Sequence, residues 1–189
     1  MTLPEVERER LDVVDGHDRV IASATRGMIH RAGLWHRAAH VLLFNRAGDL
    51  FLQRRAWWKD SEPGAWDSSA AGHLAAGEDY PQAAARELAE ELGLTAPVLL
   101  SPLFRLPASA ATGFEFVTVF RGVTDQILRP DPLEVIDGRW CGDAELAHWL
   151  GEDAHAFTTS FRTIWEHCRS VQVRDGVHDV THVNTGVTS

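Results

Sequence analysis

The sequence of 189 residues predicts an α/β (α+β) fold, in which a mixed β-sheet lies between α-helices and follows an N-terminal β-hairpin extension. Short β-type runs recur along the chain, and four helical segments lie between and after them. This mixed order is typical of a sheet that is covered by helices on both faces. An apolar fraction of 44% and a charged fraction of 24% are those of an ordinary folded domain with a sizeable core.

The N-terminal extension is expected over residues 1–35. Two β-type runs flank an Asp-Gly turn, which predicts a hairpin over residues 11–25. Thr25 is placed to cap a short helix over residues 26–32, and Gly33 is placed to end it.

The main domain is expected over residues 36–172, and a polar tail over 173–189 is expected to be loosely ordered or to form an edge strand. Residues 45–49 read as the turn of a second hairpin. Strands are predicted over 38–44, 50–54, 66–74, 98–106, 114–121 and 135–140. Helices are predicted over 80–92, 143–150 and 158–170.

Charge and composition limit the partners of this chain. Its 27 acidic and 18 basic residues give a net charge of −9, so duplex nucleic acid is not an expected partner. A small phosphorylated substrate is compatible with this negative charge, since a divalent cation can supply positive charge locally. No apolar run is long enough to span a bilayer, and residues 1–10 lack the apolar core of a secretory signal. The two cysteines, Cys141 and Cys168, are expected to be buried small hydrophobes in a reduced, cytoplasmic protein.

The helix over 80–92 has the clearest boundaries in the sequence. Asp79 is a plausible N-cap with Gln82 three residues later, Pro81 lies in the first turn, and Gly93 stands at the C-terminal end. At 100° per residue the expected core face consists of Pro81, Ala84, Ala85, Leu88 and Leu92.

Three glutamates, Glu87, Glu90 and Glu91, lie on a neighbouring arc of the same helix. Glu87 and Glu91 repel each other at i, i+4, and the C-terminal half of a helix disfavours anions. A bound divalent cation would remove both penalties, and clustered carboxylates suit Mg²⁺. The alternative is a solvated acidic face in which Arg86 and Glu90 form a surface ion pair.

The glutamates belong to a longer pattern that resembles the Nudix box. By average residue usage, chance would produce the pattern on the order of once in ten million chains of this length. The matching positions are Gly72, Glu78, Arg86, Glu87, Leu88, Glu90, Glu91, Gly93 and Leu94.

The resemblance implies the Nudix fold and a magnesium-dependent hydrolase, with Mn²⁺ as a substitute metal, that cleaves a diphosphate bond in a small nucleotide-like or other diphosphate-containing substrate. Carried over by position, Glu87 and Glu91 are the main metal ligands and Glu90 lies beside them. The backbone carbonyl of Gly72 would approach the metal, as a residue without Cβ allows. Arg86 would orient a carboxylate.

Two roles stay open at this point. The carboxylate that Arg86 orients is Glu78 or Glu87. The metal would acidify a water molecule that attacks phosphorus. The residue that takes the proton of this water is Glu87, Glu91 or Glu115.

Outside the box, roughly residues 12–165 look like the isopentenyl-diphosphate isomerase branch of the superfamily. Matches occur at 34–38, 44–45, 53–55, 63–67 and 72–73. Isomerases of this branch need a cysteine directly before the Gly-His pair, where this chain has Ala71, and their Nudix box is degraded, whereas this one is intact. Both departures favour hydrolysis. The alternatives are an isomerase-like enzyme and a catalytically inactive nucleotide-binding module.

The same resemblance implies a second metal site. His36, His73 and Glu115 occupy metal-ligand positions of the isomerase branch, with His30 as a further candidate. Neutral imidazoles with a carboxylate suit zinc or manganese. The alternative is that the histidines are partly buried and bind the backbone.

Basic and aromatic residues flank the expected site. Arg54 and Arg55 end a strand, and strand alternation allows only one of them to bind a substrate phosphate. Trp66 is expected in the core. Trp57 and Trp58 lie in an irregular loop, over 56–65, that packs on the domain or on a second subunit of a homodimer.

Overall fold

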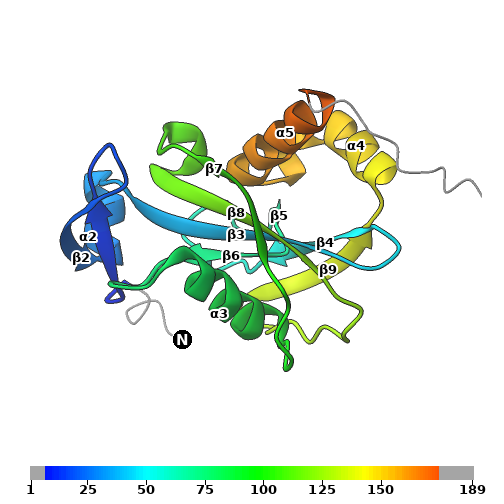
Figure 1. Ribbon diagram of the computed structural model, residues 1–189, viewed down its shortest axis with the longest axis horizontal. Helices are drawn as coiled ribbons and strands as arrows, with labels where there is room; N and C mark the ends of the chain where they lie inside the picture. Colours follow the sequence, from blue (N-terminus) through cyan, green and yellow to red (C-terminus); the bar gives the residue numbers. More distant parts are fainter. Residues whose placement is uncertain (1–6, 175–189) are drawn as a thin grey trace, which may run out of the picture.

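The computed structural model describes residues 7–174, which form a seven-stranded mixed sheet with helices on both faces (Figure 1). The predicted α/β (α+β) fold is confirmed. The strands of the sheet are β3 (His36–Phe44), β4 (Leu50–Arg55), β5 (Trp66–Asp67), β6 (Ala70–His73), β7 (Ser101–Leu106), β8 (Glu115–Val123) and β9 (Val135–Cys141). The main path runs β5-β4-β3-β8-β7, while β6 pairs with β3 and β9 with β4. The helices that cover it are α3 (Tyr80–Leu92), α4 (Asp143–Glu152) and α5 (Thr159–Arg174).

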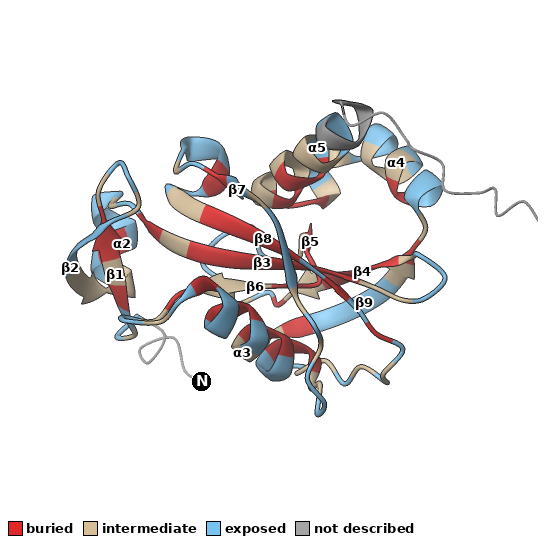
Figure 2. Ribbon diagram, viewed as in Figure 1, coloured by how far each residue is buried: buried red, intermediate tan, exposed pale blue. Residues whose placement is uncertain are grey.

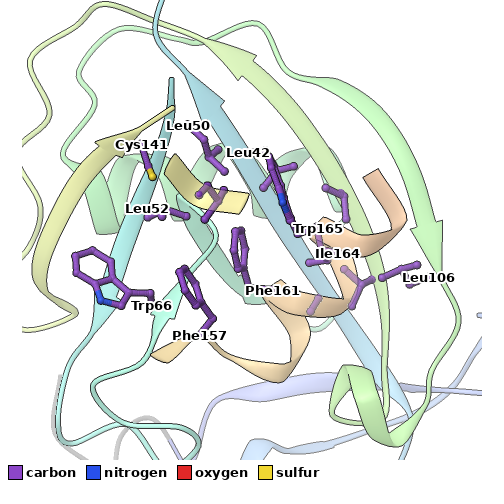
Figure 3. Packing of buried hydrophobic residues seen from close by; sticks show 14 residues of the cluster. Leu42, Leu50, Leu52, Trp66, Leu106, Cys141, Phe157, Phe161, Ile164 and Trp165 are labelled. Atoms are coloured by element: carbon purple, nitrogen blue, oxygen red, sulfur yellow. The ribbon is translucent and has the colours of Figure 1, made fainter. Parts of the chain in front are cut away.

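Strand β3 contributes to the hydrophobic cores on both sides of the sheet. Ala39, Val41 and Leu43 pack in the core beneath α3, whereas Ala38 and Leu42 pack in the core beneath α4 and α5. Figure 3 shows the second core, and Figure 2 shows that the central strands are buried while the outer helix faces are exposed. Because side chains alternate along a strand, the histidines at even positions of β3 point to the α5 side.

The N-terminal hairpin forms as predicted and builds a small core of its own. β1 (Arg10–Val14) and β2 (Val20–Thr25) pair antiparallel, and α2 (Arg26–Ala32) follows them directly. The Thr25 side chain caps α2, and Gly33 ends it in the left-handed conformation at φ +60°. Leu11, Val13 and Ile29 are buried between these elements.

The strand predicted over 66–74 is wrong as a single element. The chain forms β5 and β6 instead, which pair with β4 and β3 respectively. The reason is that β3 and β4 pair only at Phe44 and Leu50, next to their shared turn. Ser68 and Ser69 connect the two short strands, and the Ser69 backbone amide donates to the carbonyl of Val41 at 3.0 Å.

Helix α3 has the predicted bounds, and the predicted capping box between Asp79 and Gln82 is present. The predicted core face is partly wrong, because Pro81 and Ala85 are exposed. The buried stripe is rotated by about one residue and consists of Tyr80, Ala83, Ala84, Glu87, Leu88, Glu91 and Leu92. Two of the three glutamates therefore face the protein and not the solvent.

Within residues 7–174 no helix is both long and apolar enough to cross a membrane. Cys141 is buried as expected, and Cys168 is half-buried against the same core. Of the tail predicted over 173–189, the first two residues belong to α5, and residues 175–189 lie outside the described part of the chain.

Candidate active site and metal centre

Glu87 and Glu91 form a buried carboxylate pair on α3. Their exposed fractions are 9% and 4%. Burial, followed by the negative charge of Glu91, raises the pKa of Glu87 well above its usual range. Burial also raises the pKa of Glu91, against the opposing charge of Lys59. When both carboxylates of this buried pair are ionised, they repel each other, and a bound cation would stabilise them.

Fixed hydrogen bonds orient Glu91. Its Oε2 accepts from the side-chain amide of Gln53 at 2.9 Å and from the backbone N–H of Ala71 at 3.0 Å. Its Oε1 lies 4.0 Å from the Lys59 ammonium, which also contacts Glu134. One carboxylate oxygen of Glu91 is thus held by neutral donors, while the other faces the Lys59 ammonium.

Glu87 lies directly on the backbone of Gly72. A Cβ atom at position 72 would stand 1.9 Å from the Glu87 Oε1 atom, so any residue other than glycine would displace the Glu87 carboxylate from this position. Besides the expected approach of its carbonyl to a metal, Gly72 has a steric role, since its missing side chain makes room for the Glu87 carboxylate.

Arg86 connects the carboxylates of the box. Its guanidinium donates to both oxygens of Glu78 at 2.9 and 2.8 Å, and to Glu87 Oε1 at 2.7 Å. It therefore contacts both residues between which the sequence left the choice open. Arg86 also donates to Glu90 at 3.1 Å, but the Glu90 side chain is 58% exposed and lies at the rim, apart from the buried pair.

The carboxylate pair lines an open cavity of about 310 Å³, which we call the outer cleft. Sequence reasoning missed several of its residues, because single basic or acidic residues outside a motif carry no signal of their own. Arg26 and Lys59 supply positive charge to the cleft, and Glu9 joins it from the N-terminal segment. The Nε atom of Arg26 is buried and has no hydrogen-bond partner among the described residues.

A second cavity of about 130 Å³, the inner pocket, lies on the α5 side of β3 and β6. Arg26, Gly72 and His73 line both the inner pocket and the outer cleft. The two cavities therefore meet at the end of β6.

The second predicted set of residues meets at this junction. Ligand atoms of His30, His36 and His73 lie within 4.8 Å of one another. Glu115 Oε1 lies 2.9 Å from His73 Nε2 and 3.5 Å from His36 Nε2. His36 Nδ1 donates to the carbonyl of Leu34 at 2.9 Å, which leaves a lone pair on its buried Nε2. The donor set fits a transition-metal ion.

The protonation of this cluster also suits a metal. Burial lowers the pKa of His73 to about 4, so its ring is neutral at neutral pH. Burial opposes the ionisation of Glu115, but its close contacts with His36 and His73 outweigh burial and hold the pKa of Glu115 well below its usual range.

Of Arg54 and Arg55, only Arg55 lines one of the two cavities, and the pairing of β4 with β9 shifts register between these two residues. Arg55 lines the inner pocket and donates to Asp67 Oδ2 at 3.3 Å. Arg54 instead lies over the rings of Trp57 and Trp66, at 5.3 and 5.9 Å from their centres.

The tryptophans divide as predicted between core and loop. Trp66 is 8% exposed and belongs to the core beneath α5. In the loop, Trp58 donates to the carbonyl of Leu133 of the same chain, while Trp57 is 65% exposed.

Comparison with known proteins gives matches over most of the chain. An isopentenyl-diphosphate Delta-isomerase of Burkholderia multivorans is 35% identical over 165 residues, which are 85% of this chain and 90% of that protein. An uncharacterized Nudix hydrolase of Pseudomonas aeruginosa is 38% identical over 137 residues, 71% of this chain and 79% of that one.

Among solved structures, the protein DR0079 of Deinococcus radiodurans superposes with a TM-score of 0.68 at 28% identity. The match covers 76% of this chain and 90% of that one. The family model of the NUDIX domain matches residues 34–161 of this chain. This range contains the whole box, the buried carboxylate pair and the histidines of β3 and β6 that line the inner pocket. The chain belongs to the Nudix family.

Proposed function

We propose that this protein is a Mg²⁺-dependent hydrolase that cleaves a diphosphate bond in a small nucleotide-like or other diphosphate-containing molecule. The observation that carries the proposal is the buried pair of Glu87 and Glu91, held against the backbone of Gly72. Two repelling carboxylates on a buried helix face have no structural benefit, and such local conflicts mark functional sites.

Mg²⁺ fits this donor set, because it is a hard ion that takes carboxylate and phosphate oxygens. Glu87 and Glu91 would hold it, with Glu90 and the Gly72 carbonyl close by, and Mn²⁺ could replace it. Such an ion supplies charge neutralisation at the phosphoryl oxygens and acidifies water.

The remaining residues bind the anionic substrate and accept a proton. Arg26 and Lys59 are placed to bind phosphate oxygens in the outer cleft. Water forms a new bond to phosphorus, the bridging P–O bond breaks, and a carboxylate takes the proton of the water. Glu87, Glu91 and Glu115 are the candidates for this proton acceptor, and a base whose pKa lies near neutral pH is the most effective.

We also infer that His36, His73 and Glu115, with His30, hold a zinc or manganese ion. The support is the convergence of their ligand atoms and the lone pair left on His36 Nε2. This ion would lie at the junction of the two cavities, where it would bind oxygen atoms of a substrate.

A substrate screen tests the main proposal. Purified protein with Mg²⁺ is given nucleoside di- and triphosphates, dinucleotide polyphosphates, nucleotide sugars, coenzyme A and isoprenoid diphosphates, and released phosphate or nucleotide is measured. We expect turnover of at least one compound that is abolished by EDTA and restored by Mg²⁺. Metal-independent turnover, or none at all, would contradict the proposal.

The second candidate function is isomerisation of isopentenyl diphosphate, which relatives named for that activity favour. Ala71 opposes it, because a methyl group at the position before Gly72-His73 cannot carry a proton. A catalytically inactive nucleotide-binding module is less well supported, because such a module has no need for buried repelling carboxylates.

A further inference from the structure

The inner pocket has a second polar end that the proposed chemistry does not use. His40 lies on the same face of β3 as His36, four residues further on and thus about 13 Å away along the strand. It is 4% exposed and lines the pocket. Its Nδ1 lies 2.8 Å from the Ser68 hydroxyl, and Nε2 has no hydrogen-bond partner among the described residues.

Charged residues surround this histidine. Asp67 Oδ1 lies 4.0 Å from His40 Nδ1, and Asp67 is itself 3% exposed. Its other oxygen accepts from Arg55 at 3.3 Å. Thr158 and Ser160, at the start of α5, line the same cavity. A buried polar network of this kind disfavours any ligand that offers it no hydrogen bond.

The pocket has room beside His40 because its neighbour across the sheet is small. His40 pairs with Ala71 in the register of β3 and β6, so both side chains lie on the pocket face. A cavity of about 130 Å³ is close in size to engineered cavities that hold a single six-membered ring. The volume of the pocket therefore matches one ring.

We propose that the inner pocket is a binding site for a single hydroxyl-bearing ring attached to the diphosphate, and that His40 is the residue that determines this specificity. A hydroxyl both donates and accepts, so it matches His40 Nε2 in either tautomer of the imidazole. A five-carbon hydrocarbon group fits by size but leaves Nε2 without a partner, which lowers its affinity. This inference rests on the proposed function, because the outer cleft must hold the diphosphate.

The test compares three probes, ADP-ribose, ADP and isopentenyl diphosphate, on the native protein and on His40→Leu with saturating Mg²⁺. ADP-ribose carries a ribose on its terminal phosphate, which ADP lacks. We expect the native protein to have a higher kcat/KM for ADP-ribose than for the other two. His40→Leu should lower this value about 10- to 100-fold, leave ADP unchanged, and leave or improve isopentenyl diphosphate.

Thr118→Val is the matched control. Thr118 is equally buried on β8, and its register with Ala39 places it on the opposite face of the sheet. It should affect no probe. A uniform loss with all probes in His40→Leu, or an unchanged preference for ADP-ribose, overturns the inference.

Binding separates this inference from the proposed function. If no probe is hydrolysed, the proposed function fails, and titration calorimetry with ADP-ribose and ADP still decides the role of His40. A ribose-dependent gain in affinity that His40→Leu removes supports the inference, and equal affinities contradict it.

Discussion

Replacement of Glu91 by glutamine separates the catalytic from the structural role of the buried pair. Both donors that bind Glu91, Gln53 and the Ala71 amide, converge on one oxygen. The amide oxygen of a glutamine has two lone pairs and can accept both hydrogen bonds. The fold should therefore be kept, while one negative charge of the proposed metal site is removed.

The expected magnitudes follow from these contacts. A divalent ion stabilises a transition state by several kcal/mol. If Glu91→Gln removes about 3–4 kcal/mol of this stabilisation, turnover falls roughly 10²–10³-fold. In contrast, relief of the i, i+4 repulsion between Glu87 and Glu91 is worth about 0.2–0.5 kcal/mol or more. For a chain of this size the metal-free Tm should stay level or rise by about 1–2 °C.

The assay measures Mg²⁺-dependent turnover of a substrate from the screen, together with thermal unfolding in EDTA. Glu166→Gln is the control, because this glutamate is exposed on α5, away from both cavities. It should change neither quantity. Refutation would come from a Glu91→Gln protein that keeps most of its turnover. A metal-free Tm more than about 5 °C below that of the native protein would show that Glu91 is structural.

Three further predictions follow from the site. Given isopentenyl diphosphate and metal, the native protein and Ala71→Cys should form no dimethylallyl diphosphate, and product from the native chain would assign the isomerase reaction. Protein purified without chelator should contain about one zinc or manganese ion per chain by elemental analysis, and His73→Ala should lose it; equal, near-zero content in both would refute the second site. Because burial holds the pKa of His73 near 4, its share of metal-free stability should be present above about pH 6.5 and be lost as the pH falls towards 4. The raised pKa values of Glu87 and Glu91 act in the opposite sense, so the contribution of these two residues to metal-free stability should be lost as the pH rises above about 5. Thermal melts over this pH range, in EDTA and in excess Mg²⁺, would measure both effects.

Local signals in the sequence predicted most of the fold. The bounds of α3 follow from its capping box and from Gly93, and both hairpins follow from their turn residues. The break between β5 and β6 could not be predicted, because it depends on where β3 and β4 separate in space. The burial of Glu87 and Glu91 was missed for a related reason: hydrophobic periodicity assigns the core face to apolar residues and leaves charged residues outside it.

The box showed which carboxylates meet, but it could not show what surrounds them. Arg26, Lys59 and Gln53 come from three separate segments, and only the folded sheet brings them to the carboxylate pair. His40 is a similar case. In the sequence it is one polar residue in an apolar strand, and only the register with Ala71 places it in a cavity.

The N-terminal extension and the Nudix box, separate in the sequence, line the same cavities in the structure. Arg26 and His30 come from the first 35 residues, yet they line the cavities around Gly72. The hairpin turn is bound to the main domain through Asp18, which adopts φ +60° and accepts a hydrogen bond from the Tyr80 hydroxyl at 3.0 Å. Because Tyr80 is the first residue of α3, the contact that docks the extension also holds the start of the helix that carries the carboxylate pair. Residues from both segments therefore line the same cavities, although more than 40 positions separate Arg26 from the start of the box at Gly72.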